Sequence, residues 1–279
     1  MSSIIFPFGT ILFYCIGIPA LQRFMKNKKS PNLKGILVIH NLFLSAMSCF
    51  MAIFLLTTVI SFGHIQNGGY SYHQIFCSLN HHDQKGTLTF LYYINYLLKY
   101  YELLDTVFLS LKHRPISFLH GYHHPATLAL TWGQLVDSTG IQWIIIFLNL
   151  CVHTVMYFYY FIMAAKLKFL KPKSWKMLVT LMQITQFIID LSVSYYGCFA
   201  NRWFNQCIGT VRSAIIGLFI LTSYLYLFVD FFADAYQNKA ANVRLPAIWT
   251  SLLIVFVSSL VYILSTVIDP IWPHLNFYR

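Results

Sequence analysis

The chain has 279 residues, of which 58% are hydrophobic and only 10% are charged. Soluble domains carry about 25% charged residues, so this composition excludes an ordinary soluble protein and indicates an integral membrane protein. The formal net charge is +11. Because the cations gather in alternate loops, they indicate membrane topology rather than nucleic acid as a partner.

Eight apolar runs approach or exceed the roughly 20 residues that cross a bilayer as a helix. They are 4–21, 36–62, 88–111, 116–136, 141–165, 175–198, 211–235 and 247–268. The first seven predict a single all-α integral membrane domain that occupies the whole chain, 1–279, with short connections. The last run, taken as 246–268, is a candidate eighth helix, and if it spans the bilayer the C-terminus lies in the lumen.

Basic residues follow every second apolar run. They are Arg23, Lys26, Lys28, Lys29, Lys34, Lys112, Arg114, Lys166, Lys168, Lys171, Lys173, Lys176, Lys239 and Arg244. The intervening loops hold few cations, so the positive-inside rule places the basic loops in the cytosol and the N-terminus in a lumen or outside. This cytosolic face would also attract a polyphosphate ligand such as coenzyme A.

Two of the six cysteines, Cys77 and Cys207, fall in loops that this topology places outside the cytosol. Thiols can be oxidised in such a compartment, so these two residues are predicted to form a disulfide. The six cysteines have no CxxC or Cys/His spacing typical of a metal site.

The run 88–111 contains the stretch KYYELLDT, which places Lys99, Glu102, Asp105 and Thr106 three, three and one residues apart. This spacing predicts that one face of a helix carries all four side chains. Charge inside a membrane is costly and marks a functional candidate. A self-neutralising Lys–Glu pair with a purely structural role remains open as the alternative.

Two later runs carry similar polar stripes. The run 141–165 places Asn149, His153, Met156 and Tyr160 on one face with Tyr157 beside them, and the run 175–198 does the same with Thr180, Gln183, Gln186 and Asp190. Hydrogen-bonded helix packing accounts for Thr and Gln, but Asp190 is harder to explain in this way. From the helical rise the stripes lie at similar depth, which predicts one polar pocket in the cytosolic half of the membrane.

The stretch HGYHH places His120, His123 and His124 at spacings that let them point the same way. Three such imidazoles suit metal ligation or acid, base and nucleophilic chemistry. The chain has only one such histidine box and too few further histidines for a two-iron site. A single metal held by these three residues and His153 stays open as an alternative.

A metal-free alternative uses one of these imidazoles as an acyl acceptor. A neutral histidine can attack a thioester to give a reactive acyl-imidazole, while a neighbouring histidine moves the proton. Asn149, Gln183 or Tyr157 could then stabilise the oxyanion or enolate. Pro125, which directly follows the box, removes a backbone donor and disfavours helical geometry at His124, so a local break that aims the imidazoles is expected.

Four motifs in the same order resemble the signatures of the fatty-acid elongase family, the membrane very-long-chain 3-oxoacyl-CoA synthases. The motifs are KYYELLDT, HGYHH, NLCVHTVMYFYY and TLMQITQF, and the resemblance covers about residues 5–238. It implies an endoplasmic-reticulum enzyme that condenses a long-chain acyl-CoA with malonyl-CoA to 3-oxoacyl-CoA, CO2 and coenzyme A. No cofactor or metal beyond these substrates is implied.

The resemblance also implies roles for individual residues. His123 would be the acyl-accepting nucleophile, with His120, His124 and His153 as neighbouring proton-transfer or substrate-contacting groups. The site would further be lined by Lys99, Glu102, Asp105, Asn149, Tyr157, Gln183 and Gln186.

The implied fold has seven transmembrane helices, six of which form an inverted barrel around a tunnel closed at the lumenal end, with the first helix outside. The implied partners are membrane lipid and the ketoreductase, dehydratase and enoyl reductase of the elongation cycle, and a homodimer is an open alternative. Two other functions also remain open, a metal-dependent membrane lipid desaturase or hydroxylase and a non-catalytic receptor or transporter.

Overall fold

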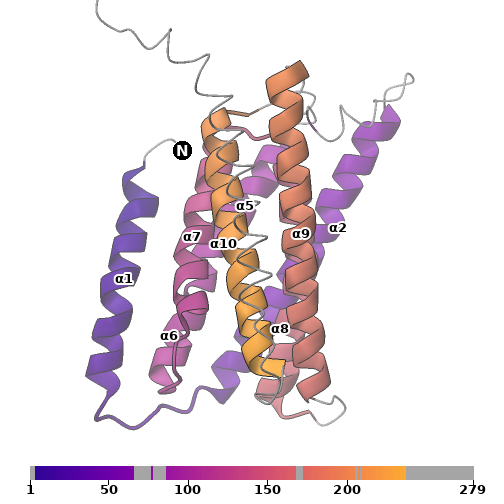
Figure 1. Cartoon of the computed structure of the whole chain (residues 1–279). Helices are drawn as coiled ribbons and strands as arrows, with labels where there is room; N and C mark the ends of the chain where they lie inside the picture. Colours follow the sequence, from indigo (N-terminus) through magenta and orange to yellow (C-terminus); the bar gives the residue numbers. More distant parts are fainter. Residues whose placement is uncertain are drawn as a thin grey trace, which may run out of the picture. The chain divides into compact units, whose positions relative to one another are not determined.

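The computed structural model describes residues 4–65, 77, 86–167, 172–204, 207 and 209–236, and their backbone forms helices without any strand (Figure 1). The helices are α1 (Ile5–Met25), α2 (Lys34–Ile65), α5 (Thr87–Glu102), α6 (Leu104–Leu111), α7 (Phe118–Val136), α8 (Gln142–Ala165), α9 (Pro172–Phe204) and α10 (Val211–Tyr236). The predicted all-helical class is confirmed for this part of the chain.

Each of the first seven predicted runs lies on one of these helices, except that 88–111 is divided between α5 and α6. Among the described residues, five helices are long and apolar enough to cross a membrane: α1, Lys34–Ser61 of α2, α8, Ser174–Phe199 of α9 and Arg212–Tyr236 of α10. These helices indicate a multi-pass membrane protein. The candidate helix at 246–268 lies outside the described residues.

The chain divides into two compact units, Met1–Phe228 and Val229–Arg279. The packing and the site described below belong to the first unit. Within the second unit the described residues are 229–236, which form the last turns of α10.

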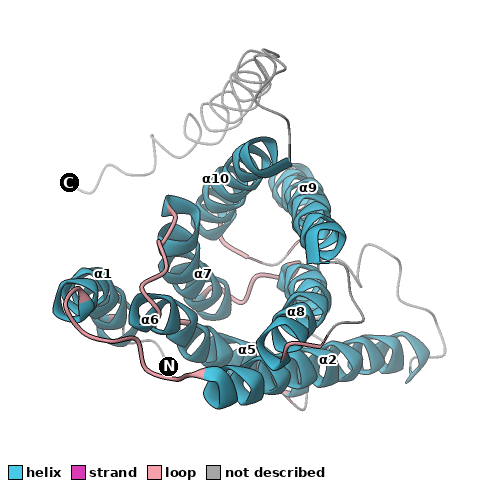
Figure 2. Ribbon diagram, turned by 90° about the horizontal axis from the view of Figure 1, so that it is seen from below, coloured by secondary structure: helices cyan, strands magenta, loops and turns pink. Residues whose placement is uncertain are grey.

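In the first unit, α7, α10, α9, α8 and α5 lie side by side in this order (Figure 2). α5 packs against α7 and α8, and α8 packs against α9. The rings of Phe187 on α9 and Tyr224 on α10 have centroids 5.4 Å apart. The hydroxyl groups of Tyr122 on α7 and Ser223 on α10 are 2.8 Å apart. Side chains of all five helices can therefore reach a common interior.

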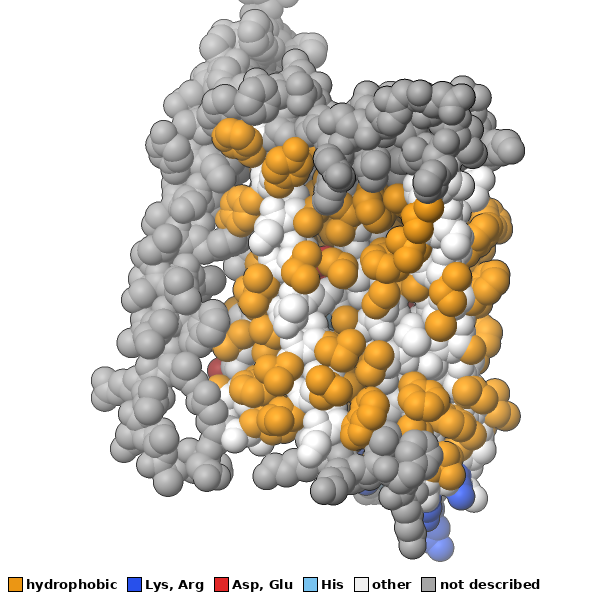
Figure 3. All heavy atoms as spheres, turned by 90° about the vertical axis from the view of Figure 1, so that its right-hand side faces the viewer, with side chains coloured by type: hydrophobic (Ala, Val, Ile, Leu, Met, Phe, Trp, Pro, Cys, Tyr) orange, Lys and Arg blue, Asp and Glu red, His pale blue; other side chains and the backbone are white. Residues whose placement is uncertain are grey.

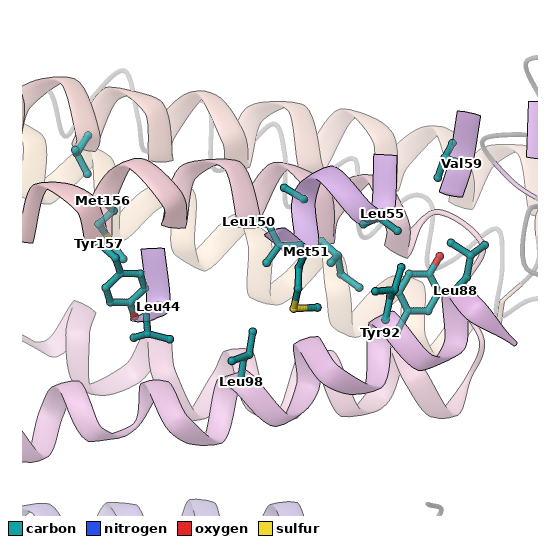
Figure 4. Packing of buried hydrophobic residues seen from close by; sticks show 14 of the residues in the cluster. Leu44, Met51, Leu55, Val59, Leu88, Tyr92, Leu98, Leu150, Met156 and Tyr157 are labelled. Carbon is teal, nitrogen blue, oxygen red and sulfur yellow. The ribbon is translucent and has the colours of Figure 1, made fainter. Parts of the chain in front are cut away.

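The apolar core lies where α2, α5 and α8 meet (Figure 4). Leu44 on α2 and Leu88 on α5 are fully buried, and Leu150 on α8 is 1% exposed. Because α2 also packs against both α5 and α8, the leucines of the three helices interdigitate and exclude solvent. This packing holds α5, which carries Lys99, and α8, which carries His153, in place against α2.

The outward surface of the described helices is strongly apolar. Ile39 on α2, Phe199 on α9 and Phe219 on α10 are 71%, 51% and 64% exposed. Figure 3 shows hydrophobic side chains spread over one face of the described part, with Lys and Arg side chains at its lower end. Such continuous apolar exposure is expected where lipid replaces water as the solvent.

Helix α1 packs against α6 and α7 (Figure 2). The ring of Phe8 meets that of Trp132 on α7 edge-on, with centroids 6.0 Å apart. Tyr14, which is 7% exposed, places its hydroxyl 2.9 Å from that of Thr106 on α6. Only 11% of the apolar window of α1 is buried, so the helix is held mainly by these side chains.

The helix is interrupted between α5 and α6 at Leu103, inside the motif whose residues Lys99, Glu102, Asp105 and Thr106 are predicted to share one helix face. The Leu103 amide donates to the Tyr100 carbonyl at 3.2 Å, and the Thr106 amide donates to the Leu103 carbonyl at 3.2 Å. These bonds span three residues, and in such a turn side chains three residues apart stay on one side. Lys99, Glu102 and Asp105 accordingly all contact α8, whereas Thr106 contacts Tyr14 of α1 and His120 of α7.

The prediction of a local helix break at Pro125 is wrong, because α7 continues from Phe118 to Val136 with Pro125 inside it. Pro125 removes the amide that would donate to the Gly121 carbonyl. In the following turn, the His123 carbonyl accepts from the Thr127 hydroxyl at 2.7 Å and from the Tyr224 hydroxyl at 3.1 Å. Proline is tolerated inside membrane helices.

Cys77 and Cys207 are joined by a disulfide in the structure, with Cα atoms 4.3 Å apart and a sequence separation of 130. Cys77 precedes α5, and Cys207 lies between α9 and α10. The bond therefore ties the segment before α5 to the segment after α9. It follows that the start of α5 and the end of α9 lie at the same end of the unit.

Candidate functional site

The histidine box lies at the start of α7, where Ser117 caps the helix. The Ser117 hydroxyl oxygen accepts from the His120 amide at 3.2 Å, which satisfies one of the free amides of the first turn. From this fixed start, the rings of His120 and His124 lie 4.5 Å apart and those of His123 and His124 lie 5.7 Å apart, measured between centroids. The structure thus brings the three imidazoles together, as their spacing predicts.

His123 is the member of the box that lines a cavity. Its ring packs against aromatic rings of α10 and α9, with centroids 4.6 Å from Tyr224 and 6.5 Å from Phe187. The Nδ1 atom of His123 is buried and has no hydrogen-bond partner among the described residues. A ring nitrogen without such a partner is not held in a structural contact and is available for chemistry.

The cavity has a volume of about 30 Å³, which exceeds the roughly 10–15 Å³ that one water molecule needs. It is lined by residues of five helices: Asn95, Lys99, His123, Thr127, Leu130, Thr131, Gln134, Ile145, Ile146, Asn149, Gln186, Phe187, Asp190, Leu221 and Tyr224. Four of these are the predicted site residues Lys99, His123, Asn149 and Gln186. They come from α5, α7, α8 and α9, so one cavity connects the four motifs.

A network of buried charges lies on the α5 and α8 side of the cavity. The Lys99 ammonium donates to Glu102 Oε1 at 2.9 Å and to Asn149 Oδ1 at 2.8 Å. Lys99 is 3% exposed and Glu102 is 4% exposed. The two charges therefore neutralise each other within α5, and Asn149 satisfies a further proton of the ammonium.

The same network fixes the tautomer of His153. Because the oxygen of the Asn149 amide faces Lys99, its nitrogen faces His153 Nε2, at 3.3 Å. An amide nitrogen only donates, so His153 Nε2 accepts and the proton of a neutral ring sits on Nδ1. That nitrogen lies 3.2 Å from Glu102 Oε1, which orients the ring by a charge-assisted contact.

Asp105 belongs to a second network that faces α2 and α8. Its Oδ1 lies 2.7 Å from His40 Nε2, and its Oδ2 accepts from the Tyr157 hydroxyl at 2.7 Å. His40 is 2% exposed and Tyr157 is 1% exposed. The carboxylate is thus held between two buried donors, which fixes α6 against both helices.

Thr106 links the histidine box to the first helix. Its hydroxyl lies 3.0 Å from His120 Nε2 and 2.9 Å from the Tyr14 hydroxyl. A threonine hydroxyl carries one proton, so Thr106 can donate to only one of these two groups.

The two glutamines of α9 are placed differently. The Gln183 amide nitrogen lies 3.5 Å from the sulfur of Met156 on α8, so this residue packs between helices outside the cavity lining. Gln186 lines the cavity and donates to Asp190 Oδ2 at 3.0 Å. Within the described residues, no three His, Cys, Asp or Glu side chains are grouped so that they could hold a metal ion.

Tyr14 and Asn95 take part in the site but are missed by the sequence analysis. Tyr14 lies on an apolar helix whose aromatic residues have no distinguishing pattern. Asn95 could have been found, because it precedes Lys99 by four residues and so shares the helix face of a motif that the analysis singles out.

Comparison with known proteins gives a consistent result. The sequence profile of ELO, described as the GNS1/SUR4 family, matches residues 1–244. Fatty acid elongase A of Dictyostelium discoideum is 38% identical over 246 residues, which cover 86% of this chain and 86% of that protein. Very long chain fatty acid elongase 6 of Drosophila melanogaster is 32% identical over 242 residues, covering 81% and 72%.

A human relative extends the similarity. Very long chain fatty acid elongase 3 of Homo sapiens is 30% identical over 241 residues, which cover 85% of each chain. The resemblance inferred from the four motifs is confirmed by these matches. The chain belongs to the GNS1/SUR4 family.

Proposed function

We propose that this protein takes part in fatty-acid elongation by condensing a long-chain acyl-CoA with malonyl-CoA to 3-oxoacyl-CoA, CO2 and coenzyme A. Relatives named as fatty acid elongases support the substrate class. The observation that carries the proposal is the position of His123, which lines the cavity with a ring nitrogen that has no partner among the described residues.

In the first half of the reaction, a ring nitrogen of neutral His123 attacks the carbonyl carbon of the acyl thioester. The nitrogen–carbon bond forms, the carbon–sulfur bond breaks, and coenzyme A leaves as a thiolate that takes up the proton released by the imidazole. His124 and His120, whose rings stand in contact with each other and beside His123, are suited to carry that proton.

In the second half, malonyl-CoA loses CO2 and the electron pair left behind forms an enolate. The enolate carbon attacks the acyl carbonyl, the new carbon–carbon bond forms, and the bond to His123 breaks. The imidazolide that leaves takes up a proton from solvent, which returns the neutral imidazole. Negative charge develops twice on oxygen during these steps. The Lys99 ammonium lines the same cavity and is the positive group suited to stabilise it.

The other predicted residues act on these groups rather than on the substrate. Glu102 and Asn149 hold Lys99 and His153. Asp105 and Tyr157 hold α6 against α8, and Gln183 supports the packing of α9 on α8. We assign these residues as positioning groups.

The helices α2 and α5 to α10 would enclose a tunnel for the acyl chain, as the family resemblance implies, with α1 outside. Cations near the ends of α1, α2 and α6, such as Lys28, Lys34 and Lys112, would face the cytosol and the phosphates of coenzyme A. This orientation places the N-terminus in the lumen of the endoplasmic reticulum. A tag at each terminus, tested by protease protection of sealed microsomes, measures it directly.

The product determines which partners are needed. A 3-oxoacyl-CoA becomes a longer saturated chain only after reduction, dehydration and a second reduction, so the partners are a ketoreductase, a dehydratase and an enoyl reductase. A homodimer is a further proposal, and the mass of the purified protein in nanodiscs tests it.

The experiment uses purified full-length protein, labelled malonyl-CoA and a panel of acyl-CoA substrates. We expect labelled CO2 release and a 3-oxoacyl product from the wild type, and loss of both in His123→Ala with normal accumulation of protein. His113→Ala is the control, because this exposed imidazole contacts the Lys28 carbonyl away from the cavity.

A single-turnover reaction with acyl-CoA alone tests the covalent step. Release of one coenzyme A per active site, together with a peptide around His123 that gains the mass of the acyl group, would support it. Condensation retained in His123→Ala would overturn the assignment.

A further inference from the structure

The cavity at His123 contains a second group of polar side chains that the proposed chemistry does not use. Asn95 on α5 and Gln186 and Asp190 on α9 line it together. They are 2%, 5% and 0% exposed. Three polar side chains this deeply buried on the wall of one cavity require hydrogen-bond partners.

Two of their oxygen atoms lack such partners. Asp190 Oδ2 accepts from the Gln186 amide at 3.0 Å, but Asp190 Oδ1 and Asn95 Oδ1 have no hydrogen-bond partner among the described residues. A buried acceptor left in this state carries the full cost of its lost hydration. Two such acceptors lining one cavity indicate a ligand that brings a hydrogen-bond donor.

The cavity lining does not fit an anionic ligand. The described ion pairs include none with Asp190, and Lys99, the cation that lines the same cavity, is bound to Glu102 and Asn149. The Gln186 amide, which donates to Asp190, lies on the same wall. A hydroxyl group, which both donates and accepts, matches amide and carboxyl neighbours.

The polar group lies farther from the basic loops than His123 does. On α9, Asp190 follows Phe187 by three residues, and the Phe187 ring contacts that of His123. On α5, Asn95 precedes Lys99 by four residues, a displacement of about 6 Å along the helix. Since the disulfide ties the segment before α5 to the segment after α9, both displacements run toward the same end.

We propose, on the basis of the condensing function above, that Asn95, Gln186 and Asp190 form a subsite for a hydroxyl group carried by the acyl chain. A chain attached at His123 and directed away from the cytosol passes this group. A plain hydrocarbon would leave Asp190 Oδ1 and Asn95 Oδ1 without a hydrogen-bond donor. A hydroxyl group on the chain at this depth donates to one of these oxygens and so gains a hydrogen-bond partner itself. The subsite therefore favours acyl-CoA molecules that carry a hydroxyl group at one particular carbon of the chain.

The test measures binding to full-length protein in nanodiscs, by competition with a labelled acyl-CoA. The competitors share one chain length and carry a hydroxyl at successive carbons, with the unsubstituted chain as reference. At one position we expect binding about tenfold tighter than the reference, and a ratio near one at the others. Asp190→Leu and Asn95→Leu should each bring the ratio at that position close to one.

Ser192→Ala is the matched control, because this hydroxyl sits two residues from Asp190 on the exposed side of α9 and donates to the Ile188 carbonyl. It should leave the tenfold ratio unchanged. If Asp190→Leu does not accumulate, the scan with the wild type and the Asn95→Leu variant decide the question.

Two results would overturn the subsite. In the first, no hydroxyacyl-CoA binds more tightly than the unsubstituted acyl-CoA, which would mean that only water contacts Asn95, Gln186 and Asp190. In the second, both leucine variants keep the preference. Release of CO2 from malonyl-CoA is measured separately, so a protein that releases CO2 without hydroxyl preference refutes the subsite alone. One that shows the preference but never condenses refutes the proposed function alone.

Discussion

At the scale of single residues, Glu102 neutralises the buried positive charge of Lys99. It is the carboxylate that pairs with the buried Lys99 ammonium, and it also contacts His153. Removing one member of a buried ion pair leaves the other charge without compensation, which costs more than the pair itself contributes.

Glu102→Gln is therefore expected to lower the free energy of unfolding by about 3–5 kcal/mol. The double variant Lys99→Met with Glu102→Gln should recover most of that loss, because no charge is then left buried. Reversible unfolding in mixed SDS micelles measures both variants against the wild type. Equal losses in the single and the double variant would show that the missing counter-charge is not the cause.

Tyr157→Phe tests the hydroxyl that donates to Asp105. The carboxylate keeps His40 as a partner and its side chain is 18% exposed, so water replaces part of the lost bond. We expect a loss of about 1 kcal/mol in the free energy of unfolding. Tyr226→Phe is the control, since Tyr226 is 45% exposed on the outer surface of α10. A loss no larger than that of the control would contradict the role assigned to this bond.

At the level of elements, the motif around the interruption between α5 and α6 connects several helices. Glu102 and Asp105 both contact α8, through His153 and Tyr157. Asp105 also contacts His40 of α2, and Thr106 contacts Tyr14 of α1. One short motif thus joins three helices.

Tyr14→Phe tests how α1 is held. The variant removes the hydroxyl contact with Thr106 and leaves the ring contacts of Phe6 and Phe8 in place. Because little else of α1 is buried, we expect faster amide hydrogen exchange in peptides from α1 and unchanged exchange in α8. Unchanged exchange in α1 would show that the ring contacts alone hold the helix.

The helix positions could be predicted from sequence because a bilayer requires long apolar runs. The expected run 141–165 became Gln142–Ala165, and 211–235 became Val211–Tyr236. The break at Leu103 could not be predicted, since leucine favours helix and no glycine or proline marks the position. The expected break at Pro125 was wrong, because α7 continues through this residue and membrane helices tolerate proline.

The site was predictable to the extent that its residues share helical spacing. Lys99, His123, Asn149 and Gln186 meet in one cavity, and their motifs had indicated a common pocket. Which of them contact each other depends on helix rotation and register, which sequence spacing within one helix does not encode. The pairing of Tyr14 with Thr106, 92 residues away, is of this kind.

At the scale of the whole molecule, the disulfide between Cys77 and Cys207 closes a loop of 130 residues that contains α5 to α9. Closing a long loop restricts the unfolded chain, and a bond of this kind contributes about 2–4 kcal/mol. We expect the double variant Cys77→Ser with Cys207→Ser to lose stability by this amount. Peptide mapping without reductant should recover the two cysteines in one linked fragment.

Cys15→Ser is the control, because Cys15 is a free, exposed thiol on α1. It should change neither the stability nor the linked fragment. Recovery of Cys77 and Cys207 as free thiols from intact protein would contradict the bond, and with it the assignment of this end of the molecule to an oxidising compartment.

The close pairing of Lys99 with Glu102 also bears on how the chain is made. The two residues lie three apart on one helix, whereas Asn149, the next partner of Lys99, is synthesised 50 residues later. An isolated lysine or glutamate is costly to move into a bilayer, and an adjacent opposite charge reduces that cost. Because α5 carries its own counter-ion, it can enter the membrane during synthesis before α8 exists to receive it.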